Sequence, residues 1–110
     1  MNLTDTLTIS ATRILDVARQ ITLQLGEWQY HRDLVVSVNT FHGDGPLVFV
    51  SLAATANDAT RREFIDAVSQ ALDSPVSVLP RRAGGQLLSV SARGYDWSGV
   101  TVAASVQVAR

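Results

Sequence analysis

Two histidine–aspartate pairs are the residues of this sequence whose types and spacing could support catalysis. His42 and Asp44 lie two positions apart in FHGDGP, and His31 and Asp33 have the same spacing in EWQYHRD. A histidine oriented by a carboxylate can act as a general base, but it needs a nucleophile or a bound water to act on. The chain has no cysteine and no G-x-S-x-G motif to supply a recognisable nucleophile. We therefore predict no catalytic residues, and the sequence favours a protein that is not an enzyme.

The FHGDGP segment favours a turn over a catalytic site. Gly43 and Gly45 accept positive φ angles, Asp44 can bond its own backbone, and Pro46 fixes φ. The runs on either side, LVVSVNT and LVFVSLA, are apolar. We predict a hairpin between two strands at this point, with His42 in solvent.

The histidines also fail the spacing requirement of a metal site. Such a site would have to bring His31 and His42 together with carboxylates. About ten residues of extended strand between them span ~33 Å, so both cannot bind one ion. We predict no metal site and no cofactor.

Both tryptophans and both tyrosines fall in two short segments, Trp28–Tyr30 and Tyr95–Trp97. In an extended chain, the i, i+2 spacing directs each pair to one side. Amphipathic aromatic residues are enriched at interfaces, and they also close the end of a core with their polar tips hydrogen-bonded. Both interpretations stay open, and Trp28, Tyr30, Tyr95 and Trp97 form a candidate patch for a ligand or a partner.

Arg61 and Arg93 complete this candidate patch, because either could meet an acidic group of a ligand. Arg61 falls among the apolar residues of the second predicted helix. Its stem could lie along the sheet edge with the guanidinium in water, or it could pair with Asp33 or Asp96. A buried and paired arginine would indicate an anion site.

Composition limits the classes of partner. The nine basic residues are all arginine and are matched by ten acidic residues, which gives a net charge of −1. Nucleic-acid-binding proteins neutralise phosphates and normally carry a basic excess, so we do not expect a nucleic-acid partner. No apolar run approaches the ~18 residues of a membrane span, and no basic segment precedes the first apolar residues as in a signal peptide. We expect a cytoplasmic protein that does not bind membranes.

The length and the apolar content predict one domain over residues 1–110. The chain has 110 residues, of which 46% are hydrophobic and 17% are charged. A chain of this length can bury a core without disulfides, and the absence of cysteine makes disulfides impossible.

The first element is a predicted helix that begins after Thr4 or Asp5 and ends before Gly26. Its apolar stripe follows 4-3-4-3-4 spacing: Leu7, Ala11, Ile14, Ala18, Ile21 and Leu25. Ile9 and Leu23 fall opposite this stripe and are the candidate interface residues. Two apolar residues on the outer face of a low-charge chain favour self-association as a homodimer.

The remaining elements are two strands, a helix and three strands. From Glu27 the period is two, so Trp28 and Tyr30 are expected to share a strand face with Leu34, Val36 and Val38. LVFVSLA is apolar on both faces, as in a central strand. The last strands are predicted at VSVLP, QLLSVSAR and GVTVAASVQVA, with alternate valines of the last one facing inward.

The second predicted helix lies within TANDATRREFIDAVSQALDSP. Thr55 with Asp58 resembles a capping box, and Asn57 is an equally good cap. The predicted buried stripe is Phe64, Ile65, Val68, Ala71 and Leu72.

These elements predict an α+β fold with the order α-β-β-α-β-β-β, in which two helices accompany a five-stranded, mostly antiparallel sheet. The hypothesis for function is a non-enzymatic protein–protein interaction or assembly module that associates with a protein partner or with itself. The alternative is a small-molecule-binding domain or an enzyme, with a pocket lined by the Trp/Tyr segments and an arginine.

Overall fold

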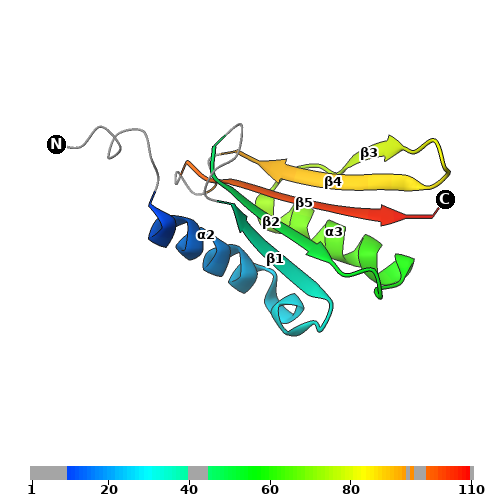
Figure 1. Ribbon diagram of the computed structural model, residues 1–110. Coiled ribbons are helices and arrows are strands. Elements are labelled where there is room, and N and C mark those ends of the chain that lie inside the picture. Colours follow the sequence, from blue (N-terminus) through cyan, green and yellow to red (C-terminus); the bar gives the residue numbers. More distant parts are fainter. Residues whose placement is uncertain (1–9, 40–44, 94, 96–98, 110) are drawn as a thin grey trace.

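The computed structural model describes residues 10–39, 45–93, 95 and 99–109. Two α-helices, α2 (Ala11–Gln24) and α3 (Asp58–Leu72), and a short 3-10 helix, η1 (Gly26–Tyr30), accompany one sheet (Figure 1). The strands are β1 (Leu34–Asn39), β2 (Leu47–Leu52), β3 (Ser77–Pro80), β4 (Gln86–Ala92) and β5 (Thr101–Val108). The predicted α+β class and the order α-β-β-α-β-β-β are confirmed.

The sheet has the strand order β1-β2-β5-β4-β3 and is mixed. Three neighbouring pairs are antiparallel, as predicted, and the β2–β5 pair is parallel. The parallel pair arises because α3 carries the chain from β2 to the far edge of the sheet. The meander β3-β4-β5 then returns inward, so β5 meets β2 in the same direction.

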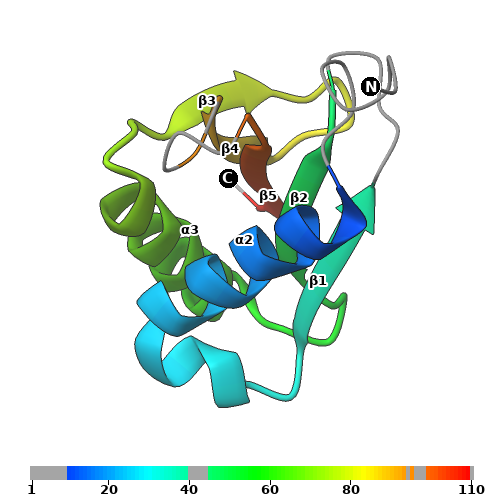
Figure 2. The ribbon, with the colours of Figure 1, turned by 90° about the vertical axis from the view of Figure 1, so that its left-hand side faces the viewer.

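Both helices lie on one face of the sheet, with α2 against β1 and β2 and α3 against β4 and β5 (Figure 2). The core fills the space between the helices and this face. The last strand alternates as predicted, and its residues Val102, Ala104, Val106 and Val108 are buried together with the preceding Val100. The predicted stripe of the second helix is also confirmed, since Phe64, Ile65, Val68 and Leu72 are buried and Ala71 is partly buried.

Local side-chain bonds define the helix ends. Ser10 caps α2 by accepting a bond from the Arg13 N–H at 3.2 Å, whereas the predicted caps Thr4 and Asp5 lie outside the described residues. Gly26 has a φ of +64° beyond the end of α2, as predicted. Asn57 caps α3 and accepts from the Thr60 N–H at 2.8 Å, and Thr55 bonds elsewhere.

The segment around Trp28 is helical, so the predicted start of the first strand at Glu27 is wrong. The Trp28 N–H donates to Leu25 O and the His31 N–H donates to Trp28 O, which is a pattern of tight turns. The Trp28 ring packs edge-on against Phe64 of α3, with 5.3 Å between ring centroids. This tertiary contact outweighs the local period-two pattern, and β1 begins only at Leu34.

The predicted hairpin between the first two strands is present, because β1 and β2 pair antiparallel with Asn39 opposite Leu47. His42 and Asp44, in the connecting segment, lie outside the described residues. Neither of the described helices is long and apolar enough to cross a bilayer.

Candidate functional site

The structure places Trp28 and Tyr95, one residue from each aromatic segment, at opposite ends of the sheet. Trp28 lies just before β1, whose first residue, Leu34, pairs with Leu52 at the end of β2. Tyr95 lies just before β5, whose first residue pairs with the start of β2. These two aromatic residues therefore do not line a common pocket.

The described aromatic residues of the candidate patch fall into two environments. Trp28 and Tyr95 are partly buried and pack against the core, as in the interpretation in which they close its ends. Tyr30 is 81% exposed. Trp97 lies outside the described residues.

The His31–Asp33 pair forms local structural bonds. The Asp33 backbone N–H donates to Nδ1 of His31 at 3.1 Å, and Oδ1 of Asp33 accepts from the Thr55 hydroxyl at 2.5 Å. The carboxylate is thus bonded to a threonine and does not orient the imidazole. Within the described ranges, no three His, Cys, Asp or Glu residues gather as metal ligands would.

Arg61 bonds to two backbone carbonyls and not to a carboxylate. Its two terminal nitrogens donate to Gln107 O at 2.7 Å and to Ala54 O at 3.1 Å. Its Nε atom is buried without a partner among the described residues. The one side-chain ion pair found in the described part of the chain joins Arg19 and Asp16, so no carboxylate there compensates the charge of Arg61.

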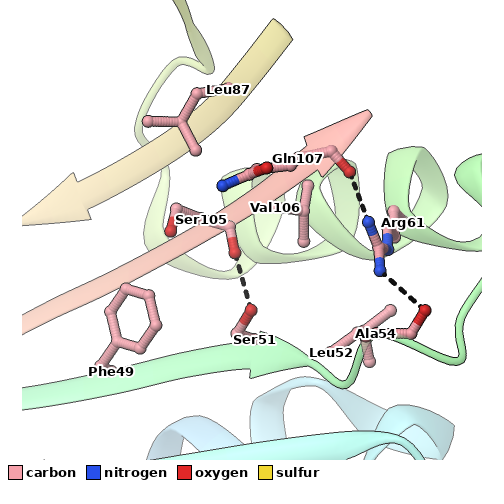
Figure 3. Close-up of a pocket in the computed structure, with 9 residues that line it drawn as sticks. All are labelled: Phe49, Ser51, Leu52, Ala54, Arg61, Leu87, Ser105, Val106 and Gln107. Carbon is pink, nitrogen blue, oxygen red and sulfur yellow. Dashed lines mark hydrogen bonds between the residues drawn. The ribbon is translucent and has the colours of Figure 1, made fainter. Parts of the chain in front are cut away.

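Arg61 lines a cavity of about 400 Å³ at the end of β5 (Figure 3). Phe49 and Leu87 lie on its two sides, and Ser51 and Ser105 lie between them. The Ser51 hydroxyl donates to Ser105 O at 2.8 Å and so joins β2 to β5. The cavity combines apolar walls, small hydroxyl residues and one cation.

Arg93 does not join Arg61. It follows β4, whose last residue pairs with Val102 at the start of β5, whereas Arg61 bonds near the end of β5. Arg81 and Arg82 are exposed in the β3–β4 turn. The fold therefore leaves Arg93 apart from the other candidate cation.

The sheet face opposite the helices carries no charged side chain on its described strands. Alternation and register place these residues on it: Val35, Ser37, Asn39, Leu47, Phe49, Ser51, Ser77, Leu79, Leu87, Ser89, Ser91, Thr101, Ala103, Ser105 and Gln107. Serine, threonine and amide side chains dominate, so this face is polar but neutral.

Exposed apolar side chains lie on both edge strands of the sheet and on α2. Val35, Val36 and Val38 of the edge strand β1 are 42%, 38% and 37% exposed, and Leu15 of α2 is 57% exposed. Val78 and Leu79 of the other edge strand, β3, are 54% and 60% exposed. Of the two predicted interface residues, Leu23 is 52% exposed and Ile9 lies outside the described residues. Sequence reasoning missed the β1 residues and Leu15, because an amphipathic pattern does not tell an edge strand from a central one.

Comparisons with known proteins found no relative of this chain. No protein-family description, no curated protein and no solved structure matches the chain.

Proposed function

We propose that this chain is a non-enzymatic protein–protein interaction module that associates with itself. The observation that supports this function is the outer side of β1, which pairs with no other strand of the described residues. Leu34–Asn39 contains no charged residue and no proline, and its valines are exposed on both faces of the strand. An uncharged apolar edge is a template for pairing with another strand.

The opposite edge of the sheet is better protected against pairing. β3 has four residues and ends in Pro80, which lacks a backbone N–H, and Arg81 and Arg82 follow directly. Short length, proline and charge are the devices by which natural sheets protect their edges. Arg32 and Asp33 precede β1, but the strand itself has six residues and contains neither proline nor charge, so the two edges differ in their capacity to bind a strand.

Light scattering coupled to size-exclusion chromatography tests this function. We expect the average mass to rise from that of one 11.9 kDa chain toward twice that value as the protein concentration increases. A mass that stays at one chain up to the solubility limit would contradict self-association.

A second candidate function is the binding of a small acidic ligand by the cavity at Arg61. The observation that favours it is a guanidinium that lines a cavity without a compensating carboxylate in the described part of the chain. Titration with acetate, succinate and inorganic phosphate is expected to shift the backbone NMR signals of Ser51 and Ser105 in a saturable way. Unchanged signals across these anions would exclude the cavity as their binding site.

A further inference from the structure

Some backbone N–H and C=O groups of β1 face away from β2, toward the outer edge of the sheet. The Ala53 N–H donates to Asp33 O at 2.8 Å, and these two residues continue the β1–β2 register. In an antiparallel ladder, every second residue bonds to the neighbouring strand. Val35, Ser37 and Asn39 therefore face β2, and the N–H and C=O groups of Val36 and Val38 face the open edge.

Leu15 of α2 lies on the same side of the molecule as this edge. Gln24 lines a cavity together with Ala67, Gln70 and Ala71 of α3, so its flank of α2 faces α3. Leu15 precedes Gln24 by nine residues, or two and a half turns at about 3.6 residues per turn, and so lies on the opposite flank. That flank faces the β1 edge (Figure 2).

Leu15 and Val38 also lie at comparable heights along the edge. The chain reverses direction through η1 between α2 and β1. Leu15 lies ten residues before Leu25, or about 15 Å along the helix, and Val38 lies four residues after Leu34, or about 13 Å along the strand. We call Leu15, Val36 and Val38 the edge strip.

A second copy of the chain fits this edge. Two-fold symmetry makes the same strand face itself, and the outward groups then meet when Val36 lies opposite Val36 of the second copy. In this register Leu34 lies opposite Val38 of the second copy, so the β1 side chains on the helix side of the junction are apolar, while the ion-paired Asp16 and Arg19 lie beside Leu15 on α2. No charges of β1 oppose each other, because Leu34–Asn39 has none.

The area available fits a weak dimer. Six residues of strand are about 20 Å long, and the strand and helix layers together are about 20 Å deep, so the junction buries roughly 1,000 Å² in total once side-chain relief is included. This value lies at the lower limit of specific interfaces. The association should therefore depend on protein concentration.

From these observations we infer that two copies pair their β1 strands antiparallel about a two-fold axis at Val36. This pairing joins two five-stranded sheets into one continuous sheet, with the edge strips of both copies in contact beside it. The inference rests on the proposed self-association and specifies its surface and register.

Cysteine cross-linking tests the register, and the chain suits it because it contains no cysteine. Residues opposite each other in a bonded pair have Cα atoms about 5.5 Å apart, which is within disulfide range. Val36→Cys is therefore expected to form a covalent dimer on mild oxidation. In this register the two copies of residue 37 are offset along the strands by two residues and lie roughly 8 Å apart, so Ser37→Cys should stay mostly monomeric.

Val78→Cys on the exposed β3 edge is the matched control for random collisions. The register would be overturned if Val36→Cys cross-linked no faster than Val78→Cys. It would also be overturned if Ser37→Cys cross-linked faster than Val36→Cys.

A charge variant gives a second measurement that needs no oxidation. Val36→Lys places two like charges opposite each other, so the dimer dissociation constant is expected to rise at least about ten-fold, whereas Val78→Lys leaves it unchanged. A dimer that persists in Val36→Lys and does not cross-link through Val36→Cys overturns the β1 pairing but leaves self-association intact. A wild-type chain that stays monomeric overturns both.

Discussion

Asp33 shows how a candidate catalytic carboxylate serves the structure. It is 9% exposed, and its side chain accepts from the Thr55 hydroxyl while its backbone oxygen accepts from the Ala53 N–H. Its own N–H donates to the His31 ring. These bonds hold the start of β1 against the segment that follows β2. The residue pair that suggested acid–base chemistry thus fixes a strand junction.

Removal of the Thr55 hydroxyl tests this role. Thr55→Val keeps the shape of the side chain but leaves Oδ1 of Asp33 without its donor, so we expect a loss of about 1.5–3 kcal/mol in the free energy of unfolding. Thr55→Ser keeps the hydroxyl and serves as the control, and urea denaturation measures both variants. Equal stabilities would mean that water replaces the threonine.

Arg61 has a comparable structural use at the other candidate site. The guanidinium bridges the segment after β2 and the end of β5 through two carbonyls. Arg62, the next residue, donates to Ala109 O at 2.9 Å, and the Ala109 N–H donates to Asp58 at 2.9 Å. The first turns of α3 therefore hold the end of the last strand, which explains an arginine among apolar positions without a bound anion.

At the scale of elements, the β3–β4 hairpin depends on glycine for two different reasons. Gly84 and Gly85 have φ angles of +91° and +80°, which disfavour any other residue. A Cβ atom on Gly85 would also lie 2.6 Å from Val108 O of the neighbouring strand, whereas one on Gly84 would meet no atom within 4 Å. A side chain at Gly84 would meet backbone strain alone, whereas one at Gly85 would meet both backbone strain and a steric clash.

Alanine substitution at the two glycines measures the cost of the backbone strain and the cost of the steric clash. Gly84→Ala is expected to lower the free energy of unfolding by about 1–2 kcal/mol through backbone strain alone. Gly85→Ala adds the clash with Val108 and should cost roughly 1–3 kcal/mol more. Thermal unfolding followed by circular dichroism gives both values, and equal losses would contradict the close approach of the hairpin to β5.

At the scale of the whole molecule, the two sides of the sheet and its two edges are unequal. One face is covered by both helices, and the other is neutral and rich in serine. Both edge strands expose apolar residues, but β3 has four residues and ends in proline, whereas β1 has six residues without proline or charge. Pairing at the β1 edge would cover Val36, Val38 and Leu15 at once. The concentration-dependent mass and the cysteine cross-links therefore test how whole molecules associate.

The sequence determined the elements that periodicity encodes. The stripe of α3, the alternation of β5, the hairpin between β1 and β2 and the class α+β follow from local spacing and turn residues. The predicted stripe of α2 is confirmed at Ile14, Ala18, Ile21 and Leu25 and is wrong at Ala11, which is exposed, while Val17 is buried in addition. The helical segment at Trp28 was not predictable, because its conformation depends on the contact of the indole with Phe64, distant in sequence. For the same reason, no local pattern separates Trp28 from Tyr95 or directs Arg61 to two carbonyls.

Only the tertiary structure decided the strand order, and the proposed surface depends on that order. A run such as LVVSVN has the same composition whether it lies in the centre of a sheet or at its edge. The crossover through α3 sends β3 to one edge and leaves β1 at the other, because β5 occupies the place beside β2. Strand pairing is a long-range interaction, so the sequence supplied the apolar residues of the edge strip, and the fold determined that they face solvent.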